Sequence, residues 1–120
     1  LTNKLLNALL ERDAVIGVVP CNSFLRRDWQ QNGGKASVSL KLAAEHIDAI
    51  CQQAGDSKHA GLGTDFDGGI GLHSVPAEIN TIADLAKLNT FLAEMGYNQS
   101  EIEDINYRNF LNMIQSVLPA

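Results

Sequence analysis

With 120 residues, a hydrophobic content of 45% and a formal net charge of −5, the chain has the composition of one small globular domain. It contains no basic stripe with interleaved aromatic residues that would indicate nucleic acid, and no apolar run near the ~20 residues that span a bilayer. Cys21 and Cys51 form no CxxC or disulfide-rich pattern, so reduced thiols in a cytoplasmic protein are the default expectation, with any upstream targeting segment unseen.

The first third of the chain predicts a helix, a strand and a loop. Residues 3–12 carry leucines on one side, as an amphipathic helix does. The continuous apolar run 14–19 is typical of a strand buried on both faces, as in a parallel sheet, and Pro20 favours its end there. Residues 22–36 then predict a polar loop.

The middle of the chain predicts a long helix and a second strand. Ser37 or Ser39 can cap a helix that continues to about Ala54, where Gly55 suits the stop. The apolar residues 60–64 predict the second strand, which leads into a loop rich in glycine.

The last third of the chain predicts two further helices, each opened by a capping box. Thr81 with Asp84 begins the first helix, which is expected to bury Ile82, and Ser100 with Glu103 begins the second. Further apolar positions expected on these helices are Leu85, Leu88, Leu92, Met95, Ile102, Ile105, Met113, Ile114 and Val117.

The predicted order α-β-α-β-α-α places the chain in the α/β class, with a right-handed βαβ unit at its centre. Two parallel strands cannot cover each other's outer edges or close into a barrel. We therefore expect residues 1–120 to be one part of a larger α/β domain that is incomplete on its own.

Two acidic residues stand where the second strand ends. Asp65 and Asp67 follow the apolar residues 60–64 and precede a glycine pair. Chemistry collects at the carboxyl ends of parallel strands, so a carboxylate there could hold a divalent metal or act as a general base. A solvated turn is the alternative, because Asp and Gly are common turn residues. Counting along the sequence excludes calcium-loop, phosphate-loop and dinucleotide motifs.

Three other positions are candidates for a role in the site or in holding the fold. Cys21 and Asn22 follow the first strand and would line the same mouth as Asp65, although a plain polar loop is equally compatible with them. Asn109 lies on the buried stripe of the last helix, where its amide needs partners, so it is expected to tether a loop or backbone. No HxH, HxD or HExxH pattern occurs, so the chain is not expected to build a two-metal site alone.

An ordered series of segments resembles the carboxyl-terminal part of the membrane (renal) dipeptidase family of zinc metallopeptidases. The most specific segment is Gly61-Leu-Gly-Thr-Asp-Phe-Asp-Gly68, which matches the glycine-rich strand and Asp-Phe-Asp-Gly signature of that family. The other matching segments are Val15–Val19, Asn22–Leu25, Glu45–Asp48, Pro76–Ile79, Met95–Tyr97 and Asn109–Leu111.

The resemblance implies the fold, the reaction and the roles of several residues. It implies a metal-dependent-hydrolase (β/α)8 TIM barrel, of which this chain supplies about two β/α units and a final helix. The complete enzyme would cleave dipeptides with two zinc ions and a bridging hydroxide. Asp65 would then be the catalytic aspartate of the eighth strand, next to the metals, and Asp67 a supporting acid. Asn22 and Cys21 would belong to the substrate pocket.

The sequence also departs from the family pattern. The zinc ligands and the substrate-binding arginine belong upstream of Leu1, so the isolated chain is expected to be inactive and to bind no zinc. Cys21 stands where an aromatic residue is common, and Asn112 replaces a usual arginine. The alternative is a non-catalytic remnant or subunit that completes a barrel with another polypeptide. Expected partners are a dipeptide and the rest of the barrel, and a homo-oligomer is compatible with either interpretation.

Overall fold

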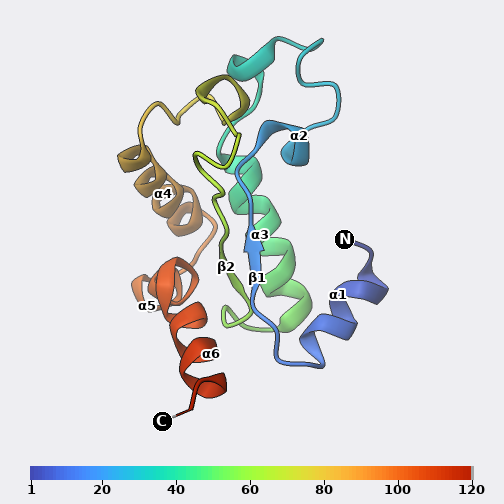
Figure 1. Cartoon of the computed structure of the whole chain (residues 1–120), viewed down its shortest axis with the longest axis vertical. Helices are drawn as coiled ribbons and strands as arrows, with labels where there is room; N and C mark the ends of the chain where they lie inside the picture. The colour runs from blue at the N-terminus through green and yellow to red at the C-terminus, as the bar shows by residue number, and fades with distance from the viewer. Residues whose placement is uncertain (120) are drawn as a thin grey trace.

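The computed structural model describes residues 1–119 and places two short parallel strands among six α-helices (Figure 1). Short 3-10 turns occur at Gly34–Ser37, Leu72–Ser74 and Ile82–Ala86, and a π turn at Asp104–Arg108. The elements in chain order are α1 (Asn3–Leu10), β1 (Ile16–Val18), α2 (Asn22–Leu25), α3 (Lys41–Ala54), β2 (Ala60–Leu62), α4 (Lys87–Glu94), α5 (Gln99–Glu103) and α6 (Asn109–Val117).

The sheet consists of β1 and β2, which pair in parallel with Gly17 opposite Gly61. Both strands are shorter than the apolar runs 14–19 and 60–64 predict. Among residues 1–119 each strand has one neighbour, so nothing extends the ladder on the outer edges. The predicted βαβ order is nevertheless present, because α3 connects the two strands.

Helix α3 provides the largest part of the core. Its apolar face is buried at Ala43, Ala44 and Ile47, as the helical spacing predicts. Gly55 ends the helix with φ of 82°, a left-handed conformation that glycine adopts without strain. The helix begins at Lys41, later than a cap at Ser37 would place it.

Two capping boxes occur in the carboxyl-terminal third, and one of them differs from the prediction. The backbone N–H of Thr81 donates to Asp84 Oδ2 at 2.9 Å, as predicted. Ile82, however, is 66% exposed, because it lies in a 3-10 turn before α4 begins. The last helical segment is capped by Asn98 with Glu101, so the prediction of a cap at Ser100 was wrong.

The final helix lies under the sheet. The Asn109 amide, which is buried, donates to the carbonyls of Ser57 at 2.7 Å and Ala60 at 2.8 Å, and so ties α6 to the entry of β2. The ring of Phe110 lies against Gly61, in space that a side chain there would need. Ile114 is exposed, although the apolar stripe includes it.

The arrangement leaves apolar surface without cover within the described residues. Each strand has an outer edge that pairs with no other strand of residues 1–119. Leu5 on α1 and Val117 on α6 are also exposed. None of the described helices combines the length and apolar character needed to cross a membrane.

Candidate functional site

The two strands end side by side, and the loops that follow them form one edge of the molecule (Figure 1). Val18 pairs with Leu62 at the end of the ladder, and the N–H of Gly63 donates to Val18 O at 3.0 Å. The segment with Cys21 and the segment with Asp65 therefore leave the sheet at the same edge. In parallel α/β folds this is the edge where ligands bind.

The acidic pair lies in a tight turn rather than on the strand. Asp65 and Asp67 are exposed, and both have left-handed backbone conformations, with φ of 49° and 70°. The N–H of Gly68 donates to Asp65 O at 3.0 Å, and Phe66 forms a bridge with Ile70. Asp tolerates this backbone region better than most residues. The strand ends at Leu62, so the side-chain alternation of a strand does not extend to the two carboxylates.

A hollow of about 320 Å³ adjoins Asp67. Apolar residues form most of its wall, and Asp67, which is exposed, is one of the residues that line it. An apolar hollow next to a carboxylate suits a ligand that carries both an amine and an apolar group. The residues that line it include Phe66, Ile70, Leu72, Val75 and Ile79.

Asn22 and Cys21 lie behind this edge rather than on its surface. Asn22 is fully buried, and its Nδ2 donates to Val75 O at 3.0 Å, which ties the loop after β1 to the loop after β2. Its Oδ1 is buried without a partner among residues 1–119. Cys21 is buried at the start of α2. Asn22 thus holds Val75, one of the residues that line the hollow.

A second tie between the loops involves Glu78. Its carboxylate accepts hydrogen bonds from the Leu40 N–H at 2.8 Å and the Ser39 hydroxyl at 2.7 Å. Burial by itself would raise the pKa of Glu78, but these hydrogen bonds outweigh it and hold the pKa below its usual value. The anionic carboxylate therefore caps the start of α3 and fixes the loop that lines the hollow.

Sequence reasoning gave no role to Glu78 or to Lys35, which also contacts this loop. Each of these side chains binds a residue about 40 positions away along the chain: Glu78 binds Leu40, and Lys35 binds Leu72. For Lys35 the preceding pair Gly33 and Gly34 was the local signal, because adjacent glycines indicate a turn. The Pro76–Ile79 segment of the family resemblance was the signal for Glu78.

The described residues do not make a metal site by themselves. No group of three or more His, Cys, Asp and Glu side chains among residues 1–119 could hold a metal ion. His73 is exposed in the loop after the acidic turn, whereas His59 lies before β2, with its Nδ1 3.0 Å from Ala14 O. That the zinc ligands belong upstream of Leu1 stays a prediction.

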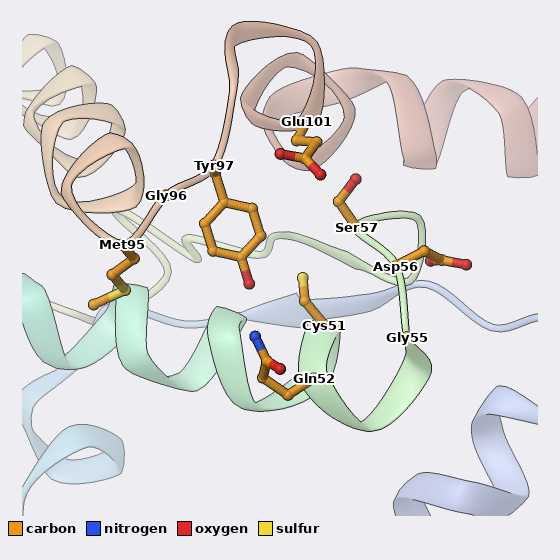
Figure 2. A pocket seen from close by; sticks show the side chains of 9 residues that line it. All are labelled: Cys51, Gln52, Gly55, Asp56, Ser57, Met95, Gly96, Tyr97 and Glu101. Carbon is orange, nitrogen blue, oxygen red and sulfur yellow. The ribbon is translucent and has the colours of Figure 1, made fainter.

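A second, polar pocket lies at the opposite end of the strands (Figure 2). It includes Ser57, which precedes β2, and Cys51 and Tyr97, which face each other across the hollow. The Tyr97 hydroxyl donates to Asp48 at 2.6 Å, and burial raises the pKa of both Tyr97 and Cys51. This network joins α3 to the end of α4. The amino-terminal face of a parallel barrel contributes to stability rather than to chemistry.

Comparison with known proteins agrees with this geometry. The family model for membrane dipeptidase, peptidase family M19, matches residues 1–118. A Klebsiella pneumoniae protein described as an uncharacterized protein in the pqqA 5′ region is 32% identical over 117 residues, which are 98% of this chain and 40% of that protein. An uncharacterized dipeptidase of Schizosaccharomyces pombe is 34% identical over 77 residues, 64% of this chain and 18% of that protein.

Solved structures share the fold. A metallo peptidase from Rhodobacter sphaeroides, liganded with a phosphinate mimic of the dipeptide L-Ala-D-Ala, matches 98% of this chain and 31% of its own with a TM-score of 0.82 and 23% identity. Dipeptidase AC, a metallo peptidase of family M19, matches 96% of this chain and 32% of its own with a TM-score of 0.80 and 23% identity.

These matches establish an α/β fold shared with the TIM-barrel-like M19 dipeptidases, and the chain spans 40% or less of the length of each of these relatives. The family model covers nearly the whole chain, including the segment with Asp65 and Asp67. The chain belongs to the membrane dipeptidase family, peptidase family M19.

Proposed function

We propose that this chain is the carboxyl-terminal part of a zinc-dependent dipeptidase. The observation that carries the proposal is the position of Asp65 in the turn that follows β2, at the edge where β1 also ends, in a chain of the M19 family. Catalytic residues of α/β barrels come from the carboxyl ends of several strands. The dipeptide mimic bound to the related Rhodobacter sphaeroides metallo peptidase supports a dipeptide as the substrate.

The proposed barrel needs further strands. The outer edges of β1 and β2 pair with no strand of residues 1–119, and the chain corresponds to 31% of the Rhodobacter sphaeroides structure. We therefore place residues 1–120 as about two β/α units and a final helix of a single (β/α)8 domain. The remaining strands would cover these edges and would supply the ligands of two zinc ions.

Asp65 is the proposed catalytic residue. Its exposed carboxylate can contact the amine of a dipeptide and exchange a proton with the nitrogen of the departing amino acid. Asp67 adds a second negative charge next to the hollow, and the buried residues Asn22 and Cys21 would help to shape the substrate pocket. We assign these residues to substrate binding and proton transfer, and the metal ligands to the strands that would complete the barrel.

The test is dipeptide hydrolysis by the full-length, zinc-loaded protein and by its Asp65→Asn variant. Loss of a positioned acid–base group costs roughly 10²–10⁴-fold in kcat, so we expect that loss with an unchanged zinc content. Asp13→Asn is the matched control, because Asp13 also has a left-handed backbone, with φ of 56°, but lies before β1 at the other end of the sheet. Wild-type kcat in the Asp65 variant would contradict the proposal.

A second candidate is a non-catalytic subunit that completes a barrel with another polypeptide, which the unpaired edges of β1 and β2 also favour. Intact mass and size exclusion separate the two candidates. A longer parent polypeptide supports the dipeptidase, whereas a 13.0 kDa chain that is stable only with a different partner supports the subunit. The isolated 120-residue chain is expected neither to bind two zinc ions nor to hydrolyse dipeptides.

A further inference from the structure

Hydrogen bonds attach the acidic turn to the rest of the molecule only at its two ends, and between those ends Phe66 and Ile70 pack against the hydrophobic core. Within the described part of the chain, residues 64–70 make hydrogen bonds only among themselves, as in the bond from Gly68 N–H to Asp65 O. The anchor before the turn is the bond from Gly63 N–H to Val18 O at 3.0 Å. Because Asp65 and Asp67 are exposed and no hydrogen bond to another element holds them, their position also depends on what holds the chain immediately after the turn.

Lys35 holds the chain immediately after the turn. Its ammonium group donates to Leu72 O at 3.0 Å, to Ile79 O, and at 3.5 Å to Asn80 Oδ1. Leu72 is the first residue after the acidic turn that makes a hydrogen bond to another element. One side chain thus binds both ends of the loop 72–80, which lines the hollow next to Asp67.

The chemistry of lysine suits this position. An ammonium group has three donors, and charge-assisted hydrogen bonds are about twice as strong as neutral ones. Gly33 and Gly34 have φ of 109° and 64°, and this left-handed turn directs Lys35 toward the loop. A side chain at position 33 would also crowd Ser37.

The other ties between the two loops attach further along the chain. Asn22 binds Val75 O, the N–H of Ala77 donates to Val38 O at 2.8 Å, and Glu78 binds Leu40. These contacts keep the loop after β2 in place when Lys35 is removed. They do not fix the end of the acidic turn.

We propose that Lys35 is a positioning residue that sets where the carboxylates of Asp65 and Asp67 stand relative to the substrate. The catalytic part of this proposal rests on the proposed dipeptidase function. The structural part, that Lys35 restrains residues 64–71, stands on the hydrogen bonds alone.

The experiment compares Lys35→Met, Lys35→Arg and Lys41→Met in the full-length, zinc-loaded protein. Small misplacements of catalytic groups cost up to roughly 10²-fold, so we expect Lys35→Met to lower kcat roughly 10- to 100-fold with a smaller change in KM. Lys35→Arg keeps the charged donors and should recover most of the loss. Lys41 is exposed, and its ammonium group makes no hydrogen bond among residues 1–119, so Lys41→Met should match the wild type.

Hydrogen exchange of the amides in residues 64–71 provides a readout that does not need activity. Exchange should become faster in Lys35→Met, while the amides of α3 keep their wild-type rates. Wild-type kcat together with wild-type exchange would overturn the proposal. If the wild type hydrolyses no dipeptide, the proposed function fails, but the exchange rates still decide whether Lys35 restrains the turn. Should Lys35→Met fail to fold, Lys35→Gln is measured in the same way.

Discussion

The carboxylate of Asp65 lies over the backbone of Gly68, in the space that a Cβ at position 68 would occupy. The two residues are also joined by the hydrogen bond from Gly68 N–H to Asp65 O. The glycine of the Asp-Phe-Asp-Gly segment is therefore required by a close approach of a side chain. Gly68 itself does not have a left-handed backbone, so an alanine there would mainly meet the carboxylate, and it would also come within 3.1 Å of the Asp65 carbonyl oxygen.

We expect Gly68→Ala to displace the Asp65 carboxylate and lower kcat/KM for dipeptides roughly 10- to 100-fold. Stability should change by less than about 1 kcal/mol, because the turn is exposed and Gly68 has no left-handed backbone. Steady-state kinetics and thermal unfolding of the full-length protein measure the two effects. The control is Gly71→Ala, whose new methyl group would meet only the exposed ring of His73. An unchanged kcat/KM in Gly68→Ala would show that the carboxylate can move without consequence.

The lowered pKa of Glu78 implies that the stability of the fold depends on pH. Burial opposes ionisation of Glu78, but hydrogen bonds from Leu40 and Ser39 prevail and lower its pKa in the folded state. A carboxyl group with a lowered folded-state pKa stabilises the fold fully above its unfolded-state pKa of about 4.3. That contribution is lost as the pH falls through the lower, folded-state pKa.

Glu78→Gln should therefore melt below the wild type at pH 7, and the difference should shrink as the pH falls from about 5 to about 3. Thermal unfolding at a series of pH values checks this. Glu94→Gln, an exposed glutamate of α4, is the control and should show no comparable trend. If the difference in melting temperature between Glu78→Gln and the wild type stays constant over this pH range, the charge of Glu78 does not contribute to the cap of α3.

The helix boundaries show how far local sequence determines this fold. The face of α3 and its stop at Gly55 follow from periodicity and from glycine conformation alone. At the start of α5, both Asn98 with Glu101 and Ser100 with Glu103 satisfy the capping pattern. The structure uses the first pair. Local chemistry permits both, so the sequence could not choose between them.

For the site, the sequence indicates where the chemistry lies but not how it is held. An apolar run followed by Asp65 marks the end of a strand, and the family resemblance gives that residue a role. The left-handed turn and the ties from Lys35 and Glu78 could not be predicted. The two ties depend on contacts between segments about 40 residues apart, for which a single sequence contains no periodic signal.

Substitution of Asn109 should lower the stability of the fold without a direct effect on catalysis. Its amide donates to the carbonyls of Ser57 and Ala60, both near the amino end of β2. Asn109→Ala leaves these acceptors without that donor, and an unsatisfied buried group costs about 1–3 kcal/mol. We expect a lower urea midpoint with kcat largely retained. Asn112→Ala, an exposed position on the same helix, should leave both unchanged. A midpoint in Asn109→Ala equal to that of the control would refute the tether.

The contact between Gly61 and Phe110 predicts a coupled pair. The Phe110 ring occupies the space where a Cβ of Gly61 would lie, so Gly61→Ala must displace the ring. Overpacking of this kind costs about 1–3 kcal/mol. Phe110→Ala is also destabilising, because it removes the ring that covers β2.

In the double variant the new methyl group at position 61 no longer meets a ring. The combined loss should therefore be smaller than the sum of the two single losses, by about 1 kcal/mol or more. Urea unfolding of the four proteins of the cycle measures this coupling. A parallel cycle with Leu111→Ala, at the exposed neighbouring position, should be additive. Additivity in the Phe110 cycle would mean that α6 does not press its ring against β2 in solution, and that the glycine at position 61 is required for another reason.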